Sequence, residues 1–193
     1  MTIFETLRNM SPCGWATVLV GWRGAGVCSP WPDDWERFPP MITHDEVLAF
    51  CEERICSASD DEQVGIVDLI EALNDKACSR VHVLTRLASL CKDSHVDENR
   101  IEIRKWRCSC IAQQLDEFDG KDVVAKVRDI EETFVEFGSL GGVPENMKES
   151  AWATDPKAHY EESQCAAELA ECRKWLESEV ASICGCDKSV NYV

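Results

Sequence analysis

The chain has 193 residues, with 36 acidic against 20 basic side chains, so its formal net charge is −16. This balance argues against direct binding of nucleic acid, because contacts to phosphate need clustered Lys and Arg. Hydrophobic residues make up 45% of the chain, which argues against wholesale disorder. The length predicts a single helical domain over residues 1–193.

The first apolar run does not predict a membrane anchor. The run from Trp15 to Trp22 is closed by Arg23, and a helix needs roughly 20 apolar residues to cross a bilayer. The preceding residues form no strongly basic segment of the kind that opens a secretory signal. We therefore expect a protein without membrane association, located in the cytoplasm.

Apolar residues recur at helical spacing along most of the sequence, and no segment alternates for long enough to predict a sheet. The stretches with helical spacing are 15–22, 43–55, 59–73, 83–91, 97–115, 123–134 and 155–185. This pattern predicts an all-α fold, a compact bundle-like array of about seven helices.

Several helix starts are marked in the sequence. Thr43 and Ser59 are each followed three residues later by Glu, which is the capping-box pattern. Asp155 and Pro156 suit the N-cap and first positions of the long C-terminal helix over 155–185.

One long connection interrupts the helical pattern. Residues 24–41 hold four Pro together with Trp31 and Trp35, and so many Pro exclude a helix. We expect a Pro/Trp-rich loop whose Trp side chains either cover the core beneath or bind a partner.

Acidic residues concentrate on one side of the helix that follows Ser59. Asp61, Asp68, Glu71 and Asp75 fall within an arc of about 80° at 100° per residue. The inward positions on that helix are predicted to be Ile66, Val67, Ile70 and Leu73. The acidic arc is either an ordinary solvated face or a surface that meets a basic partner.

The 12 cysteines are expected to be reduced and mostly buried, because no export signal accompanies them. Helical spacing directs Cys51, Cys91 and Cys172 inward.

Two Cys-x-Cys pairs, Cys108 with Cys110 and Cys184 with Cys186, could hold zinc if they converged. Structural zinc sites ordinarily use Cys-x₂-Cys spacing, and two residues apart on a helix point about 200° apart. We therefore expect no metal and no other cofactor, and the two pairs remain open as candidates.

No signature of catalysis is present. The four His residues, at 44, 82, 95 and 159, have no local nucleophile motif beside them. Phosphate-binding, dinucleotide-binding, zinc-protease and hydrolase motifs are absent from the sequence. We expect a protein that is not an enzyme.

Two stretches resemble a bacterial family catalogued as domain of unknown function 2247. The first is the run from Trp15 to Gly21, followed by Gly26 and a helix with Val47-Leu-Ala. The second begins with Trp106 and continues through 127–137 to Pro144-Glu-Asn-Met. The resemblance covers about residues 14–150, and it implies a small bacterial protein without an established activity.

Small acidic proteins of this kind resemble immunity proteins, which bind and neutralise a toxin domain. The resemblance therefore implies a non-catalytic protein that occludes the active site of a cognate, basic toxin domain. The candidate partner-binding residues are Asp61, Asp68, Glu71, Asp75, Trp31 and Trp35. The alternatives are a structural or regulatory adaptor in a larger complex and, third, a zinc-binding or Cys-dependent enzyme. The sequence does not set the oligomeric state.

Overall fold

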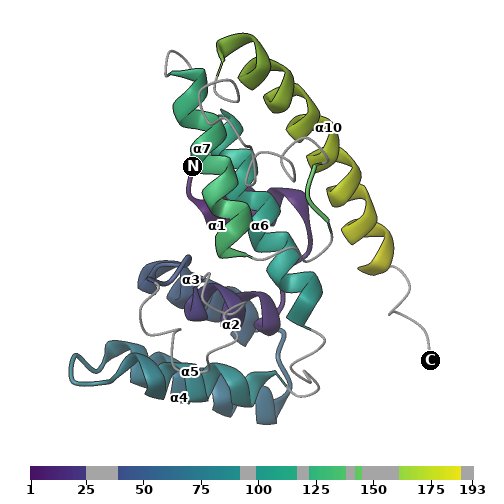
Figure 1. Cartoon of the computed structure of the whole chain (residues 1–193). Helices are drawn as coiled ribbons and strands as arrows, with labels where there is room; N and C mark the ends of the chain where they lie inside the picture. The colour runs from purple at the N-terminus through teal and green to yellow at the C-terminus, as the bar shows by residue number, and fades with distance from the viewer. Residues whose placement is uncertain (25–38, 92–98, 117–121, 138–141, 145–160, 188–193) are drawn as a thin grey trace. The chain divides into compact units, whose positions relative to one another are not determined.

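A computed structural model describes residues 1–24, 39–91, 99–116, 122–137, 142–144 and 161–187. The described residues contain eight α-helices and no strand, which confirms the predicted all-α class. The helices are α1 (Ile3–Met10), α2 (Trp15–Arg23), α3 (His44–Ile55), α4 (Asp60–Asn74), α5 (Arg80–Leu90), α6 (Asn99–Asp116), α7 (Val123–Glu136) and α10 (Glu162–Asp187) (Figure 1).

The chain divides into two compact units. One comprises Pro12–Ile103, and the other comprises Met1–Ser11 together with Arg104–Val193. The boundary falls within α6, between Ile103 and Arg104. The prediction of one domain over 1–193 stays a prediction.

The unit formed by residues 12–103 is built around α2. Seven of the nine residues of α2 are buried, so this helix is covered on nearly every side. The Trp15 ring meets the Phe50 ring of α3 edge-on at 5.0 Å between centroids. Helices α4 and α5 pack closely, because Gly65 leaves room for the Leu90 side chain.

Polar side chains tie the helix ends of this unit together. Arg80 donates to the backbone oxygens of Trp22 at 2.8 Å and Arg23 at 2.9 Å. Gly24, with φ +79°, ends α2, and a Cβ there would lie 2.3 Å from the backbone oxygen of Pro39. Glycine is thus required at this position by both its backbone conformation and its close neighbour.

The other unit buries its apolar side chains among α6, α7 and α10. Its core cluster comprises Ile111, Leu115, Val127, Ile130, Phe134, Cys165, Leu169 and Cys172. Phe4 of α1 stacks on the buried Trp106 at 5.9 Å between ring centroids. Helix α1 is absent from the helices predicted by apolar spacing, although Thr2 and Glu5 form a complete capping box at its start.

A group of buried charges lies within the same unit. Glu179 of α10 accepts from Arg104 Nε at 2.7 Å and from an Arg107 terminal nitrogen at 3.1 Å. The Arg107 guanidinium also lies 5.4 Å from the Phe134 ring centroid and 5.0 Å from that of Trp175. Only 1% of the Arg107 side chain is exposed, so these neighbours, and not water, stabilise its positive charge.

The boundaries of most predicted helices agree with the structure, with one correction. Thr43 caps α3 through a complete capping box, as predicted, whereas Ser59 precedes α4 without a side-chain cap. The Glu62 side chain, which would complete a capping box with Ser59, instead accepts the Trp15 indole N–H at 2.6 Å. Helix α10 begins at Glu162, and the predicted start at Asp155 lies outside the described residues.

None of the helices in the described ranges is both long enough and apolar enough to cross a bilayer.

Candidate functional site

Helix α4 carries three of the six predicted partner-binding residues, and a fourth, Asp75, is the C-cap residue that follows it. The burial of α4 corrects the predicted inward face. Ile66 and Leu73 are buried as expected, together with Leu69 and Ala72. Val67, in contrast, is 44% exposed. The covering helices therefore lie against the 66–69–73 side of α4, and Val67 falls beyond their edge.

The four acidic residues have different surroundings. Asp61, Glu71 and Asp75 are exposed, as the acidic-arc prediction requires. Asp68 is half-buried, and its carboxylate pairs with Arg86 of α5 at 3.2 Å. The charge of Asp68 is thus partly neutralised, and the outward acidic charge comes from the other three residues.

A second property of this face is apolar. Val64 is 64% exposed, and it lies three residues after Asp61 and four before Asp68, which places it on the same side of the helix. Val67 lies at the margin of that side. We name Asp61, Val64, Val67, Glu71 and Asp75 the α4 face.

The exposed valine was not among the sequence candidates, although the signal was available. Residues 61, 64, 68, 71 and 75 are separated by alternating steps of three and four, which is the spacing of a single helical stripe. Protein interfaces place apolar residues at the centre and polar ones at the rim, so Val64 is a candidate centre for a rim made by the carboxylates around it. Trp31 and Trp35, the other two candidates, lie outside the described residues.

Several thiols are buried and chemically inert. Burial raises the pKa of Cys51 to about 11 and those of Cys108 and Cys172 to about 12. At neutral pH these side chains are protonated, so they act as small apolar groups and not as nucleophiles. The predicted inward direction holds for Cys51 and Cys172, whereas Cys91 is half-exposed.

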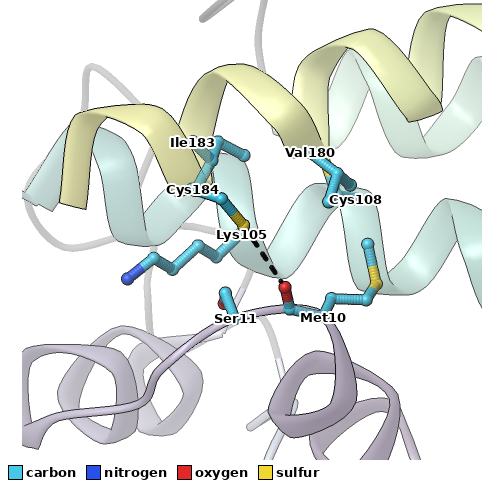
Figure 2. Close-up of a pocket in the computed structure, with 7 residues that line it drawn as sticks. All are labelled: Met10, Ser11, Lys105, Cys108, Val180, Ile183 and Cys184. Carbon is cyan, nitrogen blue, oxygen red and sulfur yellow. Dashed lines mark hydrogen bonds between the residues drawn. The ribbon is translucent and has the colours of Figure 1, made fainter. Parts of the chain in front are cut away.

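One member of each Cys-x-Cys pair lines the same small cavity. Cys108 and Cys184 face a space of about 10 Å³, together with Met10, Ser11, Lys105, Val180 and Ile183 (Figure 2). Cys184 donates its S–H to the Met10 carbonyl at 3.5 Å, so it is a thiol in this arrangement. The cavity has room for about one water. Cys110, the other member of the first pair, does not line the cavity and is half-exposed.

These features do not form a metal centre in the described ranges. No group of three or more His, Cys, Asp or Glu side chains there is arranged to hold a metal ion. The Cys186 side chain lies outside the described residues, so the expectation of no metal stays a prediction.

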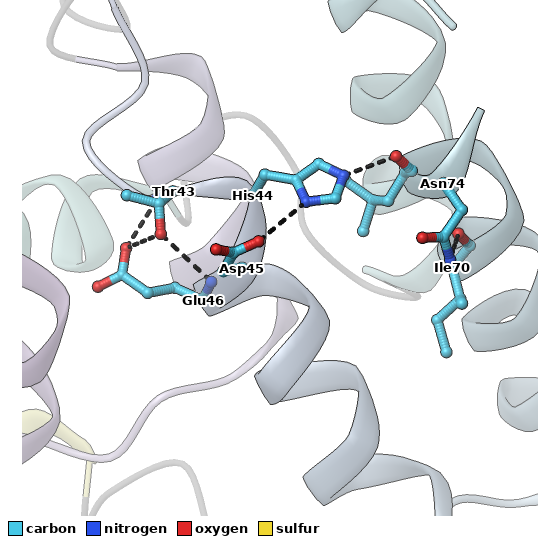
Figure 3. Close-up of polar contacts among 7 residues, drawn as sticks. Thr43, His44, Asp45, Glu46, Ile70 and Asn74 are labelled. Atoms are coloured by element: carbon cyan, nitrogen blue, oxygen red, sulfur yellow. Dashed lines mark hydrogen bonds and ion pairs between the residues drawn. The ribbon is translucent and has the colours of Figure 1, made fainter. Parts of the chain in front are cut away.

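His44 is held at the start of α3. Its Nε2 lies 2.6 Å from the Leu73 carbonyl, which can only accept, so this nitrogen carries the hydrogen (Figure 3). Its Nδ1 lies 3.5 Å from the Asp45 carboxylate. His44 therefore joins the start of α3 to the end of α4.

Comparison with known proteins gives one match. The model of a family described as an uncharacterized protein conserved in bacteria (DUF2247) matches residues 4–180. Neither the curated proteins nor the solved structures include a match to the chain.

Proposed function

The chain belongs to the DUF2247 family of bacterial proteins, and from the surface of α4 we propose that it works by binding a basic partner protein. In this proposal it is an immunity protein that covers the active site of a cognate toxin domain. The observation that carries the proposal is the α4 face, where exposed valines lie among exposed carboxylates.

Electrostatics supports a basic partner. Asp61, Glu71 and Asp75 add local negative charge to a chain whose net charge is already −16. Such a field accelerates the encounter with a positively charged surface and disfavours acidic partners. Toxin domains that attack nucleic acid need basic surfaces for their substrate, which is why the proposal names this class.

Burial of the valines would supply the short-range part of the affinity. A valine side chain contributes about 1.5 kcal/mol when it is removed from water. Carboxylates around an apolar centre fit the general arrangement of a polar rim around an interface core.

The proposal includes a non-catalytic role and a cytoplasmic location. It is supported by the protonated state of buried thiols such as Cys108 and Cys172, which gives no activated nucleophile at those positions. Cys51, Cys108 and Cys172 lie in the core without disulfide bonds, and reduced thiols are typical of the cytosol.

The first experiment is capture of the product of the adjacent gene, followed by rescue of growth in cells that express it. Stoichiometric capture of a basic, toxic domain with restored growth would support the immunity role. Capture of a non-toxic partner would instead favour the adaptor, and absence of both capture and rescue would remove the immunity role.

A charge-reversal experiment then tests the α4 face. We expect the double variant Asp61→Lys/Glu71→Lys to associate about tenfold more slowly with the partner and with a weaker dependence on salt. The matched control is Glu132→Lys/Glu177→Lys, which changes the net charge equally at exposed positions of α7 and α10. Equal slowing in both double variants would refute a local role for the α4 face.

A second variant tests the apolar centre. Val64→Asp should raise the dissociation rate about tenfold, because a buried side chain worth about 1.5 kcal/mol becomes a charged one. Val135→Asp on α7 is the control, since Val135 is also exposed, at 76%. If Val64→Asp leaves the dissociation rate unchanged, Val64 is outside the interface.

A further inference from the structure

We propose that the unit formed by residues 12–103 contains a binding pocket for a small amphipathic anion. The ligand class is a carboxylate or phosphate group on a short apolar body. The pocket has a volume of about 460 Å³, which is within the usual range of small-molecule sites. Asp75 belongs both to the α4 face and to the lining of this pocket, but the anion proposal rests on the Lys76 and Arg80 side and does not depend on the proposed immunity role.

Four helix ends form the walls of this pocket. Trp22 lies at the end of α2 and His44 at the start of α3, while Leu73 lies at the end of α4 and Arg80 at the start of α5. The turn from Asp75 to Ser79 joins the last two helices. Because polar backbone groups and charged side chains gather at helix ends, this junction combines an apolar floor with a polar rim.

The floor of the pocket is apolar and fixed. Trp22, Ala72, Leu73 and Val83 line it, and each is at most 8% exposed. The Trp22 indole N–H donates to the Arg80 carbonyl at 3.3 Å, which holds the ring in place. A preformed floor of this kind accepts an aromatic or aliphatic group with little loss of side-chain entropy.

Two cationic side chains, Lys76 and Arg80, lie on the rim beside one carboxylate, Asp75. Arg80 is held against the carbonyls at the end of α2, so its charge is fixed in position. Lys76 is exposed beside it. The helix dipoles at this junction offset one another, because α3 and α5 begin there while α2 and α4 end there. Lys76 and Arg80 together favour an anion at the mouth of the pocket.

The acidic lining residue is already engaged by the turn. One Asp75 carboxylate oxygen accepts the Ala77 N–H at 2.9 Å. The His44 ring is likewise fixed by its bond to the Leu73 carbonyl (Figure 3). Asp75 thus shapes the turn, and the anion would be bound on the Lys76–Arg80 side of the pocket.

Cys78 provides a direct test, because it lines the pocket and is half-exposed. We expect 3-phenylpropionate or phenyl phosphate to slow alkylation of Cys78 by iodoacetamide at least fivefold in the full chain. Cys56 is exposed in the same unit, so its unchanged labelling rate is the internal control. Phenethylamine, which has the same ring and the opposite charge, should give no protection.

Two variants complete the experiment. Lys76→Glu should raise the half-protecting concentration about fivefold, as expected when one exposed charge contact is lost and reversed. Lys174→Glu, an equal charge change at an exposed lysine of α10, should shift it less than twofold. Calorimetric titration with the same probes is the second readout.

The proposal fails if neither anion binds by calorimetry, or if phenethylamine protects Cys78 equally. It also fails if Lys174→Glu and Lys76→Glu shift binding by the same factor. Binding by only one of the two anions would assign the head group as carboxylate or phosphate. None of these measurements involves the partner protein, so their outcome is independent of the proposed immunity role.

Discussion

Replacement of Glu179 by Gln tests whether the buried charge group stabilises the unit that contains α10. The substitution keeps the shape of the side chain and removes its charge, while Arg107 stays 1% exposed. Breaking a buried pair and leaving the other charge behind costs roughly 3–5 kcal/mol. The Phe134 and Trp175 rings remain against Arg107, so we expect the lower end, about 3 kcal/mol.

The measurement is the free energy of unfolding from urea titration followed by circular dichroism. The control is Glu177→Gln, an exposed position on the same helix, which should change stability by less than about 0.5 kcal/mol. The triple variant Arg104→Met/Arg107→Met/Glu179→Leu should recover most of the loss, because Glu179 binds both arginines and an apolar group of similar size needs no charge partner. A loss below about 1 kcal/mol in Glu179→Gln would refute the reasoning.

Two further predictions concern local stability. Thr43→Ala should destabilise the protein by about 1 kcal/mol, because the Thr43 side chain caps α3. Ser59→Ala should have little effect, because the Ser59 side chain makes no cap bond. Urea titration of both variants measures the two losses of stability, and equal losses would contradict the prediction. Stability should also fall above pH 9, because the native state keeps a proton on Cys172, with its pKa raised to about 12, where the unfolded chain loses it. That loss is about 1.4 kcal/mol per thiol between pH 8 and pH 10. Cys172→Ala should therefore show a smaller alkaline loss than the wild type, whereas Cys56→Ala, at an exposed thiol, should not differ from it.

The existence of the helices could be predicted because each carries a local signal. The capping box at Thr43 and the apolar spacing of Val127, Ile130 and Phe134 depend on neighbouring residues in the sequence, and the structure has both. The same kind of signal at Thr2 marks α1, although the apolar spacing alone did not predict that helix. Local chemistry of this sort is independent of how the helices later pack.

The surroundings of individual side chains could not be predicted in the same way. Ser59 and Glu62 match the capping pattern, but Trp15, which is distant in sequence, takes the Glu62 carboxylate. Asp68 shares the predicted acidic arc, but Arg86 of the next helix pairs with it. Helical spacing describes one helix at a time, so it cannot show which side chain another helix supplies.

The candidate site was predicted in its charge and missed in its apolar part. Composition and spacing identified the acidic side of α4, but Val67 was expected to face inward and Val64 was not among the candidates, whereas both are exposed. An exposed valine is recognisable only when the covering helices are known, because the same spacing would serve a buried face. The pocket among the four helix ends could not be predicted for the same reason, because its lining residues come from separate parts of the sequence.

The two kinds of side chain on the α4 face should act on different steps of binding. Charge acts at long range, so reversal of Asp61 and Glu71 changes mainly how often the partner arrives in the right orientation. The Val64 side chain acts only in contact, so its loss changes mainly how long the complex lasts. With a net charge of −16, much of the steering remains after two reversals, because the rest of the chain still attracts a basic partner. Raising the salt concentration screens these charges, so it should bring the association rates of the wild type and the charge variant together. The faster dissociation of Val64→Asp should persist at every salt concentration. If the Val64→Asp effect disappeared with salt, the valine would be acting through the nearby charges, and the face would have no apolar centre of its own.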